Sequence, residues 1–415
     1  MLTSWLLFAL GLIALAGVAN ALRPSRGWLC FFSWLFGWIT VELAPHLILL
    51  STIEAAVLIW LGALDETVGW IGLAALVLAD AVAIPHILSA RHTRLDMGDV
   101  VGELDPDGPE YPRSHVVFPW LMFFRRGVRR KGGVVYSREG RLRLKLDVYM
   151  PAAPAEGPRP AVVWVHGGGW VIGSRREQGI PLLTHLAANG WVCFNIDYRL
   201  SPRATWPDHV VDVKRAIAWV RENAEEYGVD PSSICLTGGS AGGHLSALAA
   251  LTADDKSLQP GFEDADTSVA AAAPFYGVYD FLDENEQHLK LVRVVLERLV
   301  FKTRRNEDID RWRAASPHHR VTENAPPMFV ISGERDSLLG CEESRRFVER
   351  LREVSREPVL YAEMKGGQHA FDLVPTWRTV PVVEAVERFF ATMVGRRGAG
   401  GREDLEEALT ADSAP

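Results

Sequence analysis

A glycine-rich segment in the second half of the chain carries the residue types of a nucleophile. Residues 236–248 read LTGGSAGGHLSAL, with apolar residues suited to a short strand before the glycines and good helix formers after them. A G-x-S-x-G sequence between a strand and a helix is typical of a strained turn that exposes a serine hydroxyl at the edge of a sheet. Gly238 and Gly242 let the backbone turn without clashes. The segment therefore predicts Ser240 as a nucleophile.

A serine hydroxyl needs a base to take its proton, and the base needs an acid to orient it. In such an architecture the order along the chain is serine, acid, histidine. His369 follows a predicted strand that ends near residue 364, and Asp336 comes just past a buried strand. Because sites gather in loops at the carboxyl ends of strands in open α/β sheets, we predict these two as base and acid. The rivals, which fit the order or the context less well, are Glu334, Asp372, His244, His318 and His319.

A second glycine-rich loop supplies backbone N–H donors. His166 begins the sequence HGGGW after a buried strand, and its three glycines are Gly167, Gly168 and Gly169. Acyl transfer needs preorganised donors for an oxyanion, and loops of this type pair with the N–H of the residue after the nucleophile, here Ala241. The alternative is a phosphate-binding loop, but the Gly-Lys-Ser/Thr sequence and the dinucleotide spacing are absent. We expect no bound metal.

The elements around these loops alternate between strand and helix. Strands that alternate with helices predict an α/β fold with a mostly parallel sheet covered by helices on both faces. Residues 279–316 are charged, helical in pattern and interrupt the alternation, so we expect them to form a helical cap. The predicted strands are 141–149, 160–165, 191–196, 234–236, 270–276, 327–332 and 359–364, and the predicted helices are 181–188, 208–227, 344–354 and 380–393.

Residues from about 133 to 394 resemble the hormone-sensitive-lipase-like branch of the α/β-hydrolase fold, which includes bacterial carboxylesterases and arylacetamide deacetylase. The segments that carry the resemblance are HGGGW at 166–170, DYRLSP at 197–202 and GGSAGG at 238–243, with Asp336 and His369. The resemblance implies the nucleophile, base and acid named above. It also implies that the N–H groups of Gly168, Gly169 and Ala241 bind the oxyanion, while Gly167 shapes the loop. Members of this family hydrolyse carboxylic esters, typically with short or medium acyl chains, and need no metal or cofactor.

One departure from the family pattern bears on the substrate. Many relatives carry Asp or Thr before the serine, where this chain has Gly239. The sequence GGSAGGHL is also similar to relatives that remove acyl groups from carbohydrates or act on prenylated cysteine esters. The departure at Gly239 therefore bears on the identity of the substrate more than on the type of reaction.

The N-terminal quarter of the chain has the composition of a membrane domain. Residues 2–22 carry no charge and are long enough to cross a bilayer, which takes about 20 residues. A second apolar block covers 28–64 and a third covers 67–90. The second block starts with Trp and Phe residues, which favours an interfacial helix over 28–38 followed by one span over about 41–64. We therefore predict an all-α membrane domain with three spans.

The charges around these spans predict the side of the membrane. Arg23 and Arg26 follow the first span, and Arg91 and Arg94 follow the third, which places the catalytic domain in the cytoplasm. If Ala19-Asn20-Ala21 were instead a signal-peptidase site, the first block would be removed. Three polar residues inside the second block indicate either contacts between spans and at headgroup depth, which we favour, or a functional intramembrane site. They are Glu42, His46 and Glu54.

The remaining segments complete the predicted organisation. We expect a membrane domain over 1–94, a connector over 95–131, a catalytic domain over 132–395 and a disordered tail over 396–415. The connector ends in a basic cluster that either lies on an anionic leaflet or is solvated. A net charge of −8 argues against a general nucleic-acid binder. We interpret the four scattered cysteines as buried thiols.

Together these features predict a membrane-anchored serine esterase that acts on a small-molecule or lipid-like ester. A deacetylase or amidase acting on N- or O-acyl groups is the first alternative, because a triad does not separate esters from amides. The second is a catalytically inactive binding module. The pattern specifies neither the acyl chain, nor the alcohol, nor the oligomeric state.

Overall fold

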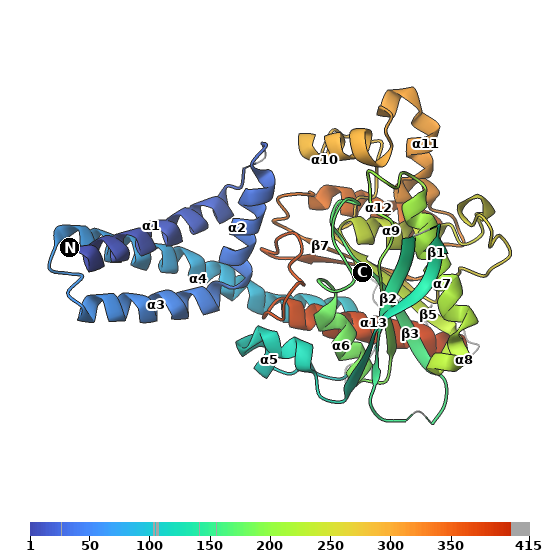
Figure 1. The fold of residues 1–415 in the computed structure, drawn as a ribbon, viewed down its shortest axis with the longest axis horizontal. Helices are drawn as coiled ribbons and strands as arrows, with labels where there is room; N and C mark the ends of the chain where they lie inside the picture. Colours follow the sequence, from blue (N-terminus) through green and yellow to red (C-terminus); the bar gives the residue numbers. More distant parts are fainter. Residues whose placement is uncertain (26, 103, 105–107, 141, 155, 400–415) are drawn as a thin grey trace, which may run out of the picture.

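A computed structural model describes residues 1–399 apart from 26, 103, 105–107, 141 and 155. The chain forms a helical N-terminal part that projects from an α/β part (Figure 1). This arrangement agrees with the fold class predicted from the sequence.

One eight-stranded sheet organises the α/β part, in the order β1-β2-β4-β3-β5-β6-β7-β8. The pairs β1/β2 and β2/β4 are antiparallel, and all the other pairs are parallel. The bounds are β1 Val128–Glu139, β2 Leu142–Pro151, β3 Arg159–Val165, β4 Val192–Ile196, β5 Val229–Gly239, β6 Ala272–Phe275, β7 Met328–Gly333 and β8 Val359–Met364.

Helices cover both faces of the sheet. Alternate side chains of a strand point to opposite faces, so each face has an apolar core of its own. In β3, Val163 and Val165 belong to one apolar core, whereas Val162 and Trp164 belong to the other. The first core is closed by α7 (Asp208–Glu222), α9 (Ala241–Leu251) and α12 (Cys341–Val354), and the second by α6 (Ile180–Ala188) and α13 (Thr379–Ala399). The short helices α8 (Ala224–Tyr227) and η2 (Lys256–Leu258) lie in the connections.

The segment predicted as a cap is helical. Its apolar side chains, such as Phe301 and Trp312, join the same core as α7 and α9. The cap elements are α10 (Lys290–Val295), the π-helical η3 (Leu296–Val300), η4 (Arg305–Glu307), α11 (Ile309–Ala314) and η5 (Pro317–Arg320).

The N-terminal part consists of α1 (Leu2–Leu22), α2 (Cys30–Glu42), α3 (Ala44–Trp60) and α4 (Thr67–Val101). By length and composition two helices, α1 and the Thr67–Ala90 part of α4, are suited to cross a membrane, and the bent pair α2–α3 allows up to three spans. The two helices meet at an 81° bend, and only together are they long and apolar enough to count as one span. In Figure 1, α2 lies at the end of the helical part that faces the α/β part, and α4 continues past it.

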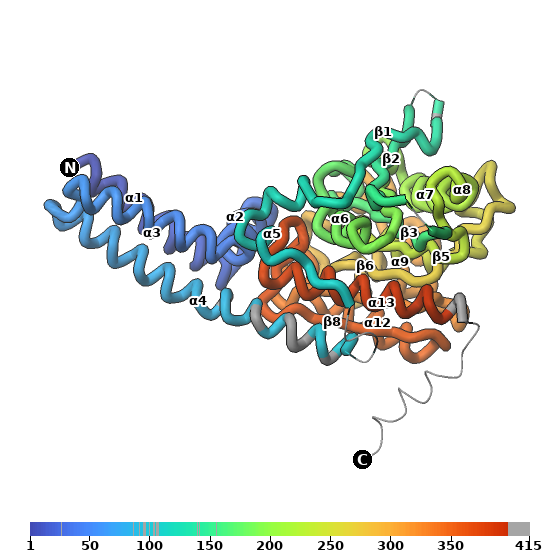
Figure 2. The backbone as a smooth tube through the Cα atoms, turned by 90° about the horizontal axis from the view of Figure 1, so that it is seen from below, coloured from blue at the N-terminus to red at the C-terminus, as the bar shows by residue number. Residues whose placement is uncertain are grey.

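Two boundaries differ from the sequence-based expectation. α4 continues past residue 94 to Val101 and packs on α13, so one helix joins the two parts (Figure 2). β1 begins at Val128 and takes in most of the expected basic cluster, with α5 (Ser114–Val117) and η1 (Pro119–Phe124) before it. The sequence missed β1 because an edge strand rich in Arg and Lys lacks a clear apolar alternation. α13 reaches Ala399, and the rest of the predicted tail lies outside the described residues.

The polar residues of the second apolar block have separate partners. Glu42 forms a buried ion pair with Arg378 of the α/β part, and His46 Nε2 lies 3.2 Å from the carbonyl oxygen of Val117. Glu54 lines, with Asp80, an apolar cavity of about 290 Å³ among the N-terminal helices. Glu42 is therefore a contact between the two parts of the chain, which neither sequence-based reading anticipated. The four cysteines are buried and free, as expected.

Candidate active site

Ser240 occupies the turn between β5 and α9. Its backbone has φ 58° and ψ −119°, a conformation that is strained for a residue with a side chain. The positive φ belongs to the serine, in agreement with the strained turn predicted from the sequence. The glycines are required for space, since a Cβ at Gly242 would lie 2.0 Å, and one at Gly238 2.5 Å, from the carbonyl oxygen of Val165.

The structure brings the three predicted triad residues together. Ser240 Oγ lies 2.9 Å from His369 Nε2, and His369 Nδ1 lies 2.6 Å from Asp336 Oδ2. The other carboxylate oxygen of Asp336 accepts hydrogen bonds from the N–H groups of Leu338 (2.8 Å) and Leu339 (2.7 Å). The side chains of His369 and Asp336 are only 6% and 1% exposed. With Nδ1–H directed at the carboxylate, Nε2 can accept the serine proton.

Two residues that the sequence did not single out, Gln368 and Tyr276, contact the histidine of this triad or the loops that carry it. Gln368 Oε1 accepts hydrogen bonds from the N–H groups of His369 and Ser337, both at 2.8 Å, and so ties the histidine loop to the acid loop. The Tyr276 ring lies 4.7 Å from the His369 ring, and its hydroxyl donates to Asp372. Gln368 directly precedes the histidine, yet no spacing rule marks it as a bridge.

The HGGG loop runs beside the nucleophile. A Cβ on Gly167 would lie 3.1 Å from Ser240 Cβ, and the Gly167 N–H already donates to Gln178 Oε1 at 2.7 Å. Within the described part of the chain, the N–H groups of Gly168, Gly169 and Ala241 have no hydrogen-bond partner. Gly168 and Gly169 have φ of 119° and 59°, which glycine adopts without strain. Ala241 directly follows the nucleophile, and Gly168 and Gly169 directly follow Gly167, the loop residue that lies beside Ser240.

His166, the first residue of the loop, contacts the loop backbone and Tyr198. Its ring stacks on Tyr198, with ring centroids 4.4 Å apart, and its Nδ1 lies 2.7 Å from the carbonyl oxygen of Gly167. The Tyr198 hydroxyl donates to the carbonyl oxygen of His166. Burial lowers the pKa of the His166 imidazole, which keeps the ring neutral. His166 therefore shapes the loop rather than transferring protons.

The rival residues have other partners. His244 lies between Trp170 and the carbonyl oxygen of Ala315, and burial lowers its pKa to about 3. Glu334 accepts the N–H of Gly366, and Asp372 accepts the hydroxyl of Tyr276. His318 and His319 lie at the base of the cap, where His319 Nε2 is 3.6 Å from Asp280. In the described part of the chain no three His, Cys, Asp or Glu side chains are grouped to hold a metal ion.

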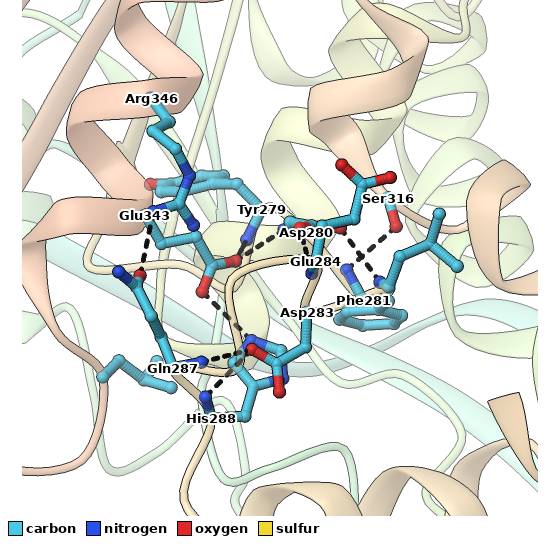
Figure 3. A network of polar contacts seen from close by, with 12 residues as sticks. Tyr279, Asp280, Phe281, Asp283, Glu284, Gln287, His288, Ser316, Glu343 and Arg346 are labelled. Carbon is cyan, nitrogen blue, oxygen red and sulfur yellow. Dashed lines mark hydrogen bonds and ion pairs between the residues drawn. The ribbon is translucent and has the colours of Figure 1, made fainter.

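The base of the cap is held by a buried network of carboxylates (Figure 3). Glu343 on α12 accepts the N–H groups of Tyr279 and Asp280, and its other oxygen lies 3.1 Å from His288 Nε2. Asp283 accepts the N–H of His288 at 3.1 Å. Burial lowers the pKa of His288, but the hydrogen bond and charge of Glu343, with the charge of Asp283, outweigh it and raise the pKa above its ordinary value.

This network predicts a pH-dependent stability. Because the pKa of His288 is higher in the folded chain than in the unfolded chain, the stabilisation is complete below the unfolded value of about 6.5 and is lost as pH rises through the folded value. His288→Gln should lower the free energy of unfolding by about 2 kcal/mol near about pH 6, and by less near about pH 8. Thermal melts of the purified full-length chain at both pH values measure the difference.

A matched control is His318→Gln, since burial lowers the pKa of His318 instead of raising it. Relative to the wild type, this variant should therefore gain stability, and not lose it, as the pH falls from about 8 to about 6. An equal destabilisation by His288→Gln at both pH values would contradict a charged His288.

Part of the chain is similar in sequence to a family model and to curated esterases. Residues 146–351 match the BD-FAE family model. The probable carboxylic ester hydrolase LipM of Mycobacterium tuberculosis is 46% identical over 276 residues, which cover 66% of this chain and 64% of LipM. Isoprenylcysteine alpha-carbonyl methylesterase ICME of Arabidopsis thaliana is 31% identical over 256 residues, covering 58% of this chain and 56% of ICME. The chain thus spans somewhat less than two thirds of the length of these curated relatives.

Solved structures show the same fold. A truncated carbohydrate esterase from gut microbiota matches 64% of this chain and 96% of its own, with a TM-score of 0.55 and 25% identity. Thermogutta terrifontis esterase 2 with bound butyrate matches 65% of this chain and 95% of its own, with a TM-score of 0.53 and 28% identity.

Proposed function

We propose that this chain, whose fold is that of the α/β-hydrolases, is a carboxylic ester hydrolase in which Ser240, His369 and Asp336 form the catalytic triad. One observation carries the proposal: Ser240 Oγ lies 2.9 Å from an imidazole whose other nitrogen lies 2.6 Å from a buried carboxylate. That geometry meets the requirement for an activated serine, namely a base within hydrogen-bond reach that is itself oriented by an acid. The esterase names of LipM and of the solved relatives support the choice of reaction.

The reaction follows from the positions of these atoms. Ser240 Oγ attacks the ester carbonyl carbon while His369 Nε2 takes the hydroxyl proton, and Asp336 stabilises the imidazolium that forms. Collapse of the tetrahedral intermediate breaks the bond to the alcohol, which leaves with the proton from Nε2. A water molecule then attacks the acyl-enzyme, gives a proton to Nε2 and releases the carboxylic acid. His369 returns that proton to Ser240 Oγ, so the enzyme is regenerated.

The negative charge of each intermediate requires donors at the carbonyl oxygen. We assign this role to the N–H groups of Gly168, Gly169 and Ala241, because they belong to the loop beside Ser240 or directly follow it in sequence, and are free of other partners within the described residues. Gly167 belongs to the same loop, but its N–H is already bound to Gln178, so it shapes the loop. Donors that are fixed before the reaction stabilise the oxyanion without reorganisation cost.

The test of the activity is a substrate panel on the purified full-length chain. p-Nitrophenyl esters of increasing acyl length and the matching p-nitroanilides are offered side by side, after active sites have been counted with a fluorophosphonate. An ester hydrolase is expected to turn over at least one ester and to cleave the anilides far more slowly. Turnover of anilides alone would assign an amidase, and labelled protein that cleaves neither would contradict the proposal.

We also propose that the N-terminal helices anchor the enzyme in a membrane through three spans, α1, the bent pair α2–α3 and α4. Large apolar side chains such as Leu6, Leu50 and Leu78 are about half exposed on these helices, which suits a lipid solvent. An ester that partitions into the membrane is the substrate this placement favours. By the distribution of Arg residues, the catalytic domain lies in the cytoplasm.

The anchoring leads to a direct prediction. Alkaline carbonate washing of membranes should leave the full-length chain in the pellet, and a mild detergent should release it, because burying about 20 apolar residues per span far outweighs peripheral contacts. Immunoblotting of pellet and supernatant measures the split, with a peripheral membrane protein as the control that washes off. Recovery of the active chain in the carbonate supernatant would reject the spans.

A further inference from the structure

One helix of the N-terminal part lies against the loop that carries His369. α2 runs across the line of the other N-terminal helices and faces the α/β part, as Figure 1 shows. Trp34, Trp38 and Glu42 are spaced four residues apart and therefore share one face of this helix. All three have polar partners in the α/β part, more than 300 positions further along the chain.

The two indoles hold the backbone at the catalytic histidine. Trp34 Nε1 donates to the carbonyl oxygen of His369, and Trp38 Nε1 to that of Ala370, both at 2.9 Å. The Trp34 ring also meets the His369 ring edge to face, with centroids 6.2 Å apart. Ala370 has φ 60°, a backbone conformation that a residue with a side chain adopts only when its surroundings enforce it. The two indole hydrogen bonds are therefore made by the strained residue Ala370 and by His369 directly before it.

An ion pair fixes the other end of the same loop. Glu42 and Arg378 are joined by two contacts of 2.7 Å between Arg378 Nη1 and the two carboxylate oxygens, and their side chains are 0% and 1% exposed. A buried charge persists in a protein only when it is paired, so this contact fixes the position of α2 on the α/β part. Glu42 Oε1 also lies 3.5 Å from the N–H of Gln368, the residue that links the histidine and acid loops.

We propose that Trp34 and Trp38 are positioning residues for His369, so that the membrane-associated helix α2 is part of the active-site framework and not only an anchor. The inference rests on the proposed function, since it assigns how the base of that triad is held. The indole N–H groups keep the His369 carbonyl, and with it the imidazole, within reach of Ser240 Oγ. A small displacement of a catalytic group lowers the rate of the covalent step far more than it changes substrate affinity.

The experiment replaces each indole by a ring that cannot donate. Trp34→Phe and Trp38→Phe are made in the full-length chain and purified in detergent. Three constants are measured on preparations of known active-site concentration: kcat and KM for an ester, and the second-order rate constant of inactivation by a fluorophosphonate. Losing one hydrogen bond at the strained loop should lower kcat and the inactivation rate together, by about fivefold to tenfold, with KM unchanged.

The matched control is Trp60→Phe, because Trp60 lies at the end of α3 with 83% of its surface exposed. It should leave both rates at the wild-type value. Melting temperatures of all variants separate a loss of folded protein from a slower reaction, since rates are counted per active site. If one of the two variants does not fold, the other still tests the proposal.

The proposal is overturned if both tryptophan variants react at the wild-type rate per active site, whatever their melting temperatures. Failure of the proposed function is a different result: a wild type that binds the fluorophosphonate covalently and cleaves no ester. In that case the inactivation rates of Trp34→Phe and Trp38→Phe still decide whether α2 positions His369.

Discussion

Ser240→Ala is expected to lower kcat/KM for any ester substrate by about 10⁵-fold or more, and to abolish covalent labelling by a fluorophosphonate. The substitution removes the hydroxyl oxygen that lies 2.9 Å from His369 Nε2 and that would attack the carbonyl carbon. The residual rate would come from the oxyanion donors and from substrate binding, which act without a nucleophile. Stopped assays at high enzyme concentration, with the labelled protein read on a gel, measure both effects.

The control for this variant is Ser246→Ala, on the helix α9 that follows Ser240. Ser246 is buried, and its hydroxyl donates to the carbonyl oxygen of Gly243 at 3.0 Å, away from the triad. Its loss should cost about 1 kcal/mol of stability while leaving kcat/KM near the wild-type value. If Ser240→Ala kept more than a small fraction of the activity, the nucleophile would have to be sought elsewhere.

Local sequence patterns predicted the elements that carry the reacting groups. The strand before the glycines and the helix after them are visible in the sequence, because continuous apolar residues and helix formers flank the turn. Asp336 follows the buried strand β7 and His369 follows the half-buried edge strand β8, and the carboxyl ends of these parallel strands meet at one edge of the sheet. The order of motifs along the chain was therefore enough to predict which side chains would come together.

The sequence predicted that the glycines prevent clashes in the turn, but not which atoms they would otherwise meet. A glycine pattern is compatible with either a positive φ or a lack of space, and only the three-dimensional packing distinguishes the two. Here Gly238 and Gly242 lie against the end of β3, whereas the strained backbone belongs to Ser240. β3 and β5 are neighbours through long-range pairing, which no local pattern reveals.

The contacts of the N-terminal helices were beyond the sequence for the same reason. Trp34 and Trp38 were interpreted as interfacial residues, because an aromatic residue in an apolar block is most often at a membrane surface. Their indole N–H groups instead reach the loop after His369. Glu42 was expected to contact another span or headgroups, and its partner is Arg378. A single sequence contains no signal for pairs that lie so far apart along the chain.

Asp336→Asn is expected to lower kcat by about 10⁴-fold with little change in folding. Asp336 Oδ2 accepts from His369 Nδ1, which fixes the tautomer in which Nε2 can take a proton. An amide in this place can present an N–H to Nδ1, which leaves the proton on Nε2 and prevents it from acting as the base. The other oxygen can still accept from Leu338 and Leu339, so the loop should persist. Single-turnover kinetics with an activated ester measure the acylation step directly.

Asp372→Asn is the matched control for Asp336→Asn. Burial raises the pKa of Asp372 to about 6, and its carboxyl group accepts the hydroxyl of Tyr276, whose ring packs on His369. An amide can also accept that hydrogen bond, so Asp372→Asn should lower kcat by no more than about tenfold. If the two variants lost activity equally, Asp372 would share the role of the acid through Tyr276. A loss confined to Asp336→Asn would assign the orienting carboxylate to Asp336, because both side chains are buried beside the same imidazole and only one touches it.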